Sequence, residues 1–158
     1  MDTQLKEDGQ KGWHPTKHEV VGFLNTQQLG RIATLGSNGQ PQIANVAFSQ
    51  NDALELIIGT SETSRKAINI MRDSRVAFEA TDPEKRYTVQ FEGNAHRLSP
   101  EEFESRSKAH FEKLPGSLPF KDITGQAHFL LKPTWVRFSD CSGASWVVTE
   151  FNIAHKAK

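Results

Sequence analysis

Residues 54–78 combine the side chains best suited to hold an anion. An apolar run, residues 54–58, ends at Gly59 and is followed by hydroxyl-bearing and cationic residues, namely Thr60, Ser61, Thr63, Ser64, Arg65 and Lys66. Apolar residues then resume at helical spacing, which predicts a strand leading into a helix that begins at Ser61 or Thr63. A helix N-terminus presents unpaired N–H groups and about half a positive charge. The pattern therefore indicates a phosphate site.

The same residues also have a plainer interpretation. Serine and threonine are the usual N-caps of ordinary helices, and an Arg-Lys pair in a first turn is often solvated surface. Glu62 already complements the helix dipole and so argues against a second anion. The local chemistry alone leaves both interpretations open.

Histidine and cysteine suggest no further site. His14 and His18 are four residues apart, but Pro15 lies between them at a helix start and no third ligand follows, so we predict no metal site. The remaining histidines, His96, His110 and His128, are isolated in the sequence and are interpreted as surface or structural residues. The single cysteine, Cys141, excludes an internal disulfide and has no evident activating base.

Length and charge limit the classes of protein that the sequence can represent. The 158 residues fit one domain with one core, and 19 basic residues balance 19 acidic ones. This balance disfavours nucleic acid as a partner. No apolar run approaches a membrane span, and the first residues lack the apolar core of a signal peptide. We expect a cytoplasmic protein without a membrane partner, with a flexible tail over residues 1–12 and a single domain over 13–158.

The order of the predicted elements gives the fold class. Helices are expected over residues 15–28, from Ser61 or Thr63 to about Asp73, and from Ser99 to about Lys113. The second of these should turn Ala67, Ile68, Ile70 and Met71 toward the core. Strands are expected over residues 31–35, 42–49, 54–58, 76–80, 87–96, 128–138 and 146–151, and Pro133 should bend the long one or place it at an edge. Mostly hairpin order predicts a mainly β fold, a small antiparallel barrel with peripheral helices.

Three segments in this order resemble the pyridoxamine 5'-phosphate oxidase family, the FMN-binding split barrels. They are NGQPQIANVAFS (38–49), GTSETSRK (59–66) and VQFEGNAHRLSPEE (89–102), and the resemblance extends over residues 16–138. It implies a split antiparallel β-barrel that binds FMN at a homodimer interface.

The resemblance also implies roles for individual residues. Gly59, Thr60 and Ser64 would contact the FMN phosphate, which Arg65 and Lys66 would neutralise. The backbone at Asn45 and Val46 would lie along the flavin ring, with Thr88 or Gln90 at its polar edge. Trp135 and Arg137 would reach the flavin from the same chain or from its partner, although an ordinary cross-strand pair would explain them equally well.

Several departures from the family bear on function. Where its oxidases hold the substrate phosphate with a lysine, this chain has Ser49, and Ala44 replaces a flavin-contacting arginine. The helix segment FESRSKAHFEKL lacks the oxidases' Tyr, Arg and Ser, and Arg137 and Asp140 remain without the His and second Arg that accompany them. Synthesis of pyridoxal phosphate is therefore not expected, and no side chain is predicted as a proton donor.

The resulting hypothesis is an FMN-dependent oxidoreductase with an unspecified small-molecule substrate. The alternative is a binding protein on the same barrel that holds flavin or haem without turnover, in storage, sensing or stress response.

Overall fold

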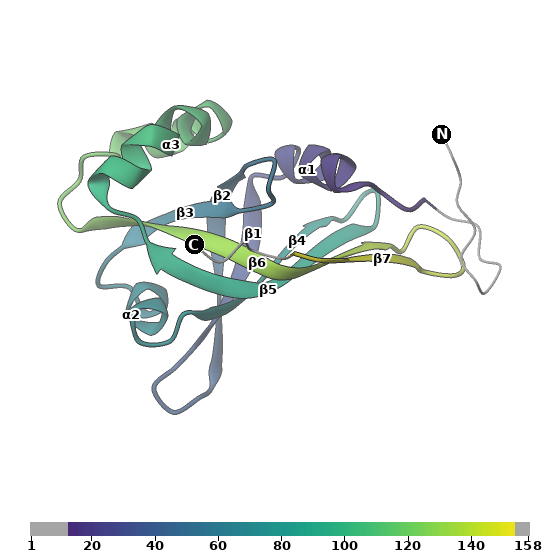
Figure 1. The fold of residues 1–158 in the computed structure, drawn as a ribbon, viewed down its shortest axis with the longest axis horizontal. Coiled ribbons are helices and arrows are strands. Elements are labelled where there is room, and N and C mark those ends of the chain that lie inside the picture. The colour runs from purple at the N-terminus through teal and green to yellow at the C-terminus, as the bar shows by residue number, and fades with distance from the viewer. Residues whose placement is uncertain (1–12, 154–158) are drawn as a thin grey trace.

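The computed structural model describes residues 13–153 and is mainly β, with helices at its periphery (Figure 1). The predicted tail over residues 1–12 lies outside this range. The strands are β1 (Leu29–Leu35), β2 (Pro41–Gln50), β3 (Leu56–Ser61), β4 (Arg75–Asp82), β5 (Tyr87–Arg97), β6 (Gln126–Asp140) and β7 (Val147–Asn152). The helices are α1 (Lys17–Asn25), α2 (Arg65–Arg72) and α3 (Pro100–Lys113), and a short 3-10 helix, η1, spans Pro115–Phe120. No helix within the described range is long and apolar enough to cross a bilayer.

Six of the strands close into an antiparallel barrel. The strand order is β3-β2-β1-β4-β5-β6-β7, and β3 also pairs with β6, where Leu56 lies opposite Leu131 and Ser61 opposite Gln126. This pairing joins the two ends of the sheet and leaves β7 outside the ring. The predicted fold, a split antiparallel barrel with peripheral helices, is confirmed.

β6 changes its neighbour part-way along its length. One edge of β6 pairs with β5 from Phe129 to Asp140, whereas the other edge pairs first with β3, up to Leu131, and then with β7, from Trp135. Pro133 lies between these two partners, opposite Gly93, where the register with β5 shifts. The missing N–H of Pro133 therefore interrupts neither of the two ladders on that edge.

The barrel interior holds one main core of alternating inward residues. Phe48, Phe78 and Phe138 are almost fully buried, and the rings of Phe48 and Phe78 pack edge to face at 4.9 Å between centroids. A second, smaller cluster of Ile57, Leu98, Phe103 and Leu130 lies under α3. The sequence predicted a single core, but α3 covers the outer face of β3 and β6, so the strands bury side chains on both faces there.

The junction between β3 and α2 lies at different residues from those predicted. Leu54 has a positive φ of 64° and belongs to a turn, so β3 begins at Leu56, and it continues past Gly59 because β6 pairs with it. α2 begins at Arg65 with Ser64 as its N-cap, not at Ser61 or Thr63.

The buried face of α2 also differs from the predicted one. Ala67, Asn69 and Ile70 face inward, whereas Ile68 and Met71 are 52% and 63% exposed, so their predicted core positions are wrong. Asn69 is accommodated because its amide donates to Thr34 Oγ1 at 2.9 Å and to Gln42 Oε1 at 3.0 Å. The buried face of α2 thus includes a polar residue, whereas the sequence pattern predicted apolar residues alone for that face.

Candidate functional site

A pair of hydroxyls marks the point where β3 leads into α2. Thr60 Oγ1 and Ser64 Oγ lie 3.1 Å apart, and Ser64 Oγ also accepts a hydrogen bond from Ala67 N at 3.3 Å. Ser64 uses a lone pair to cap the helix, so its hydroxyl hydrogen can donate to Thr60 or to a ligand oxygen. The predicted phosphate residues Thr60 and Ser64 are therefore neighbours.

Two cations begin the helix at this point. Arg65 is exposed and Lys66 is half-buried, and neither forms a hydrogen bond or ion pair with any residue of the described range. Glu62, the residue that argued against an anion, pairs with Arg97 at 2.9 Å. Its charge is therefore offset by a cation outside the helix. We refer to Thr60, Ser64, Arg65 and Lys66 as the phosphate seat.

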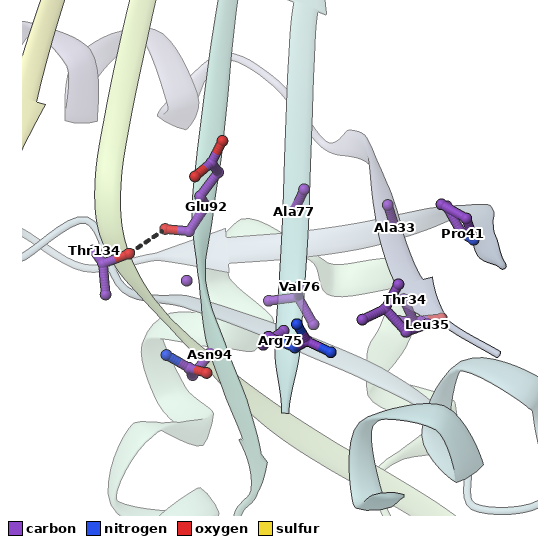
Figure 2. A pocket seen from close by; sticks show the side chains of 11 residues that line it. Ala33, Thr34, Leu35, Pro41, Arg75, Val76, Ala77, Glu92, Asn94 and Thr134 are labelled. Atoms are coloured by element: carbon purple, nitrogen blue, oxygen red, sulfur yellow. Dashed lines mark hydrogen bonds between the residues drawn. The ribbon is translucent and has the colours of Figure 1, made fainter. Parts of the chain in front are cut away.

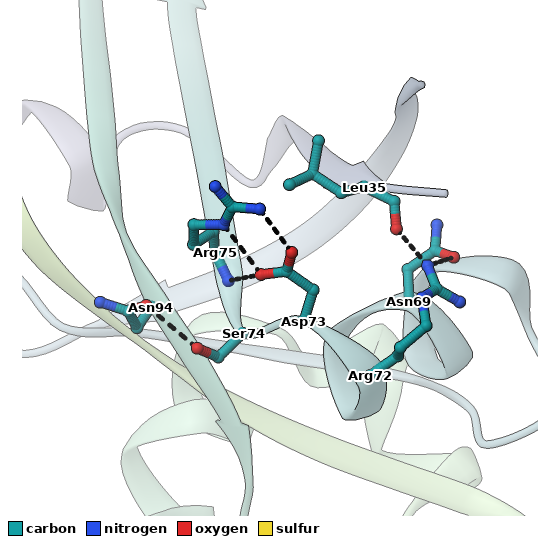
Figure 3. A network of polar contacts seen from close by, with 7 residues as sticks. All are labelled: Leu35, Asn69, Arg72, Asp73, Ser74, Arg75 and Asn94. Carbon is teal, nitrogen blue, oxygen red and sulfur yellow. Dashed lines mark hydrogen bonds and ion pairs between the residues drawn. The ribbon is translucent and has the colours of Figure 1, made fainter. Parts of the chain in front are cut away.

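The opposite end of α2 is anchored to the barrel (Figure 3). Arg72 donates to the Leu35 carbonyl and to Asn69 Oδ1, and Ser74 donates to Asn94 on β5 at 3.0 Å. Asp73 accepts two hydrogen bonds from the Arg75 guanidinium, at 3.0 and 2.7 Å. These bonds lower the pKa of Asp73 to about 2. The contacts fix the C-terminal end of α2 and hence the direction in which its N-terminus points.

Gln90, Trp135 and Arg137 lie together on the outer face of the barrel. Gln90 stands opposite Arg137 in the β5–β6 ladder, and with Trp135 it lines a hollow of about 340 Å³. The Arg137 Nε is buried without a hydrogen-bond partner in the described chain, and its distance to Glu150 Oε1 is 3.8 Å. Thr88 is bonded to Thr81 across the strands at 3.1 Å.

A second hollow adjoins this one on the same face (Figure 2). It has a volume of about 460 Å³ and shares Ala33, Ala77 and Glu92 with its neighbour. Across it, Thr134 on β6 donates to the Glu92 carbonyl on β5 at 3.2 Å. The outer face therefore offers a broad shallow surface built from five strands, β1, β2, β4, β5 and β6.

A single chain does not bring the predicted cofactor residues into one pocket. Gly59 and Thr60 line a cavity under α3, whereas Gln90 and Trp135 line the outer hollow. Asn45 is exposed and lines a further hollow near Gly30 and Thr81. Val46 is 5% exposed and points into the core, so only its backbone is available to a ligand. The roles assigned to these residues stay predictions.

The cavity under α3 has a volume of about 230 Å³ and contains two histidines, His110 from α3 and His128 from β6. His110 is 2% exposed, and its Nδ1 lies 2.7 Å from Ser49 Oγ. The His128 ring stacks on Phe103 with 3.5 Å between centroids. Burial lowers the pKa of both histidines to about 4, so both rings are neutral at pH 7.

The sequence did not predict that these residues lie together. His110 and His128 were interpreted as isolated, yet their ring centroids are 5.8 Å apart. The available signal was the buried face of α3, where Phe103, Ser107 and His110 recur at helical spacing and two of the three are polar. Within residues 13–153, no three His, Cys, Asp or Glu side chains gather in a way that could hold a metal ion.

Comparison with known proteins places the chain in a family. A model described as pyridoxamine 5'-phosphate oxidase matches residues 16–140, which is most of the chain. The chain belongs to the pyridoxamine 5'-phosphate oxidase family. Membership accounts for the split barrel.

Individual relatives within and around this family differ in what they do. A 5a,11a-dehydrotetracycline/5a,11a-dehydrooxytetracycline reductase of Streptomyces rimosus is 30% identical over 92 residues, which is 53% of this chain and 65% of the reductase. This chain therefore spans just under two thirds of the length of that curated relative.

Solved structures share the fold at low identity. A heme binding protein from Mycobacterium smegmatis superposes with a TM-score of 0.74 at 18% identity, over 89% of this chain and 60% of that one. An FMN binding protein from Nostoc punctiforme, related to pyridoxamine 5'-phosphate oxidase, superposes with a TM-score of 0.61 at 16% identity. The match covers 86% of this chain and 93% of the Nostoc chain. At these identities the likeness concerns the fold alone.

Proposed function

We propose that this protein is an FMN-dependent oxidoreductase that reduces a small organic molecule. The observation that carries the proposal is the phosphate seat, in which two hydroxyls lie beside two cations that have no partner among residues 13–153, at the start of α2. FMN, when bound, supplies the hydride or electron transfer. The chain itself supplies binding and orientation.

The donors of the seat fit a phosphate dianion. The hydroxyls of Thr60 and Ser64 donate single hydrogen bonds, the Arg65 guanidinium offers a planar fork, and Lys66 contributes a compact charge. The first N–H groups of α2 have no acceptor within the helix and add to the same field. Glu62 does not oppose the anion because Arg97 is bonded to it.

The proposal includes a homodimer with flavin at the interface. The seat and the outer hollow with Gln90 and Trp135 are separate within one chain, so a second copy is needed for both to contact one flavin. The outer face suits burial against a partner because Ile43 on β2 is 74% exposed. In this arrangement the Arg137 Nε, which is paired with Glu150 but has no hydrogen-bond partner within residues 13–153, faces the cofactor or the partner chain.

The reductive direction rests on the Streptomyces relative, which is named as a reductase. Oxidation of pyridoxamine phosphate is disfavoured because Ser49, at the position of the oxidases' lysine, is buried and bonded to His110. No cation therefore stands at that position to bind a substrate phosphate.

Titration with FMN and with riboflavin tests the proposal. Riboflavin carries the same ring without the phosphate, so FMN should bind roughly 150-fold more tightly if the seat contributes about 3 kcal/mol. Bound FMN should then be bleached by NADH or NADPH under anaerobic conditions. Equal affinity for the two flavins would contradict the assignment of the phosphate seat. Flavin that binds but is never reduced would contradict the enzymatic role.

A second candidate is haem binding without turnover, favoured by the superposition on the Mycobacterium smegmatis heme binding protein. The absorbance spectrum of the purified protein separates the two candidates. A flavin spectrum with FMN released on denaturation supports the oxidoreductase. A Soret band in the purified protein, with no response to added FMN, supports haem binding instead.

A further inference from the structure

The cavity under α3 is lined by an imidazole nitrogen that bonds to no described residue. His110 is 2% exposed, and its only hydrogen bond within residues 13–153 joins Nδ1 to Ser49 Oγ at 2.7 Å. No residue of the described chain bonds to Nε2, and the ring lines the cavity of about 230 Å³. Nε2 is not among the fully enclosed side-chain nitrogens of the described range, so it is reached from the cavity. A ligand atom that enters the cavity can therefore bond to it.

The Ser49 contact determines which nitrogen of His110 carries the hydrogen. The Ser49 hydroxyl is buried and has no other partner among residues 13–153. If Nδ1 donated to it, the hydroxyl hydrogen would be left without an acceptor, which costs about 1–3 kcal/mol. The hydroxyl therefore donates to Nδ1, and the neutral ring carries its hydrogen on Nε2. The cavity thus receives an N–H donor.

The remaining walls show what kind of group this donor meets. Ala47, Leu114 and Phe120 are apolar. Thr60, Ser117 and Gln126 are polar but uncharged, so no charged side chain occurs among the described residues of the lining. His128 adds a second neutral ring, held against Phe103. A phosphate or carboxylate buried here would have no opposite charge to offset its desolvation. An uncharged oxygen acceptor suits this lining.

The cavity also adjoins the phosphate seat. Thr60 belongs to both, and Gly59 keeps the space open, because a Cβ there would lie 3.2 Å from His128 Nε2 and 2.9 Å from Gln126 Nε2. A volume of about 230 Å³ lies below that of pockets for whole drug-sized ligands. It suits one ring of a substrate placed next to the cofactor.

We infer that this cavity binds the carbonyl oxygen of an uncharged ketone or enone substrate, with the His110 Nε2–H as its donor and Ser49 as a positioning residue. The role of this cavity as a substrate site rests on the proposed function, whereas binding of the carbonyl group does not.

The test uses cyclohexanone and phenyl phosphate as probes, titrated into the FMN-free protein and followed by imidazole ¹⁵N NMR. The free protein should show the Nε2–H form of His110, and cyclohexanone should shift its signals while phenyl phosphate should not. His110→Phe should weaken cyclohexanone binding about tenfold, the loss of one neutral hydrogen bond. His110→Gln, which retains a donor near Nε2, should restore most of it.

Controls separate this role from a structural one. Ser49→Ala should leave the ring in place but mix its two tautomers, a change that loss of packing alone would not produce. His96→Phe, at an exposed position on β5, should leave the titration unchanged. Unaltered cyclohexanone binding in His110→Phe, or an Nδ1–H form in the wild type, would overturn the inference. FMN affinity, measured on the same variants, should remain at the wild-type value, and a protein that binds cyclohexanone but never FMN would refute the proposed function alone.

Discussion

Removing both cations of the phosphate seat gives the most direct test of the structure. Arg65 and Lys66 lie in the first turn of α2 and contact no described partner, so Arg65→Ala with Lys66→Ala should change the free energy of unfolding by less than about 0.5 kcal/mol. Hydrogen bonds to charged groups contribute about 1.5–3 kcal/mol each. The lower value suits this partly exposed seat, and two such bonds amount to about 3 kcal/mol, or roughly 150-fold in affinity for FMN.

The assay is quenching of flavin fluorescence, run with FMN and with riboflavin on both proteins. FMN affinity should fall in the double variant, whereas riboflavin affinity should stay at its wild-type value because riboflavin has no phosphate. Added salt should weaken FMN binding to the wild type more than to the variant.

A matched control removes the same charge elsewhere. Lys85→Ala with Arg86→Ala takes two exposed cations from the turn between β4 and β5 and should leave both titrations unchanged. The reasoning fails if the seat variant keeps wild-type affinity for FMN. It fails equally if FMN and riboflavin lose affinity in parallel, because the cations would then act on the ring or on the fold.

Three further predictions concern stability. Gly93→Ala should destabilise the protein by about 1–3 kcal/mol in chemical denaturation, because its Cβ would lie 2.1 Å from the Lys132 carbonyl oxygen, whereas Gly116→Ala, with open space around it, should be nearly neutral. Ser99→Ala removes a capping box from α3 and should cost about 1 kcal/mol, with a matching drop in the unfolding midpoint. The pKa of His110 and of His128 falls from the usual 6.5 to about 4 on folding, so the folded state binds fewer protons between these values. The free energy of unfolding should therefore keep its highest value above about pH 6.5 and decrease toward pH 4. A free energy of unfolding that does not change over this range would contradict the neutral state of the two histidines.

Local patterns in the sequence predicted most of the barrel. β5 alternates inward and outward residues along most of its length, and the signals of Thr16 with Glu19 and of Ser99 with Glu102 gave the starts of α1 and α3, where both capping boxes are present. These features depend on residues near one another in the chain. They could therefore be predicted from the sequence without knowledge of the fold.

Features that depend on contacts between strands far apart in the chain could not be predicted from the sequence. β3 runs on to Ser61 because β6 pairs with it, so α2 begins only at Arg65. The barrel surface then buries Asn69 rather than Ile68. The contact of Ser49 with His110 joins residues 61 positions apart. The local sign of this contact is a pair of consecutive buried residues on β2, Phe48 and Ser49. The alternation of inward and outward side chains breaks there.

The change of partner along β6 has a consequence for how the chain can vary. β7 attaches to the outer edge of β6 from Trp135 onward, beyond the point where β3 leaves it, and no further strand depends on it. Shortening or replacing the C-terminal segment therefore exposes one strand edge but breaks no rung of the closed ring. Without this strand the ring of six strands would keep its hydrogen-bonded closure, and the loss would fall on the packing of Phe151 and Ile153 against the core.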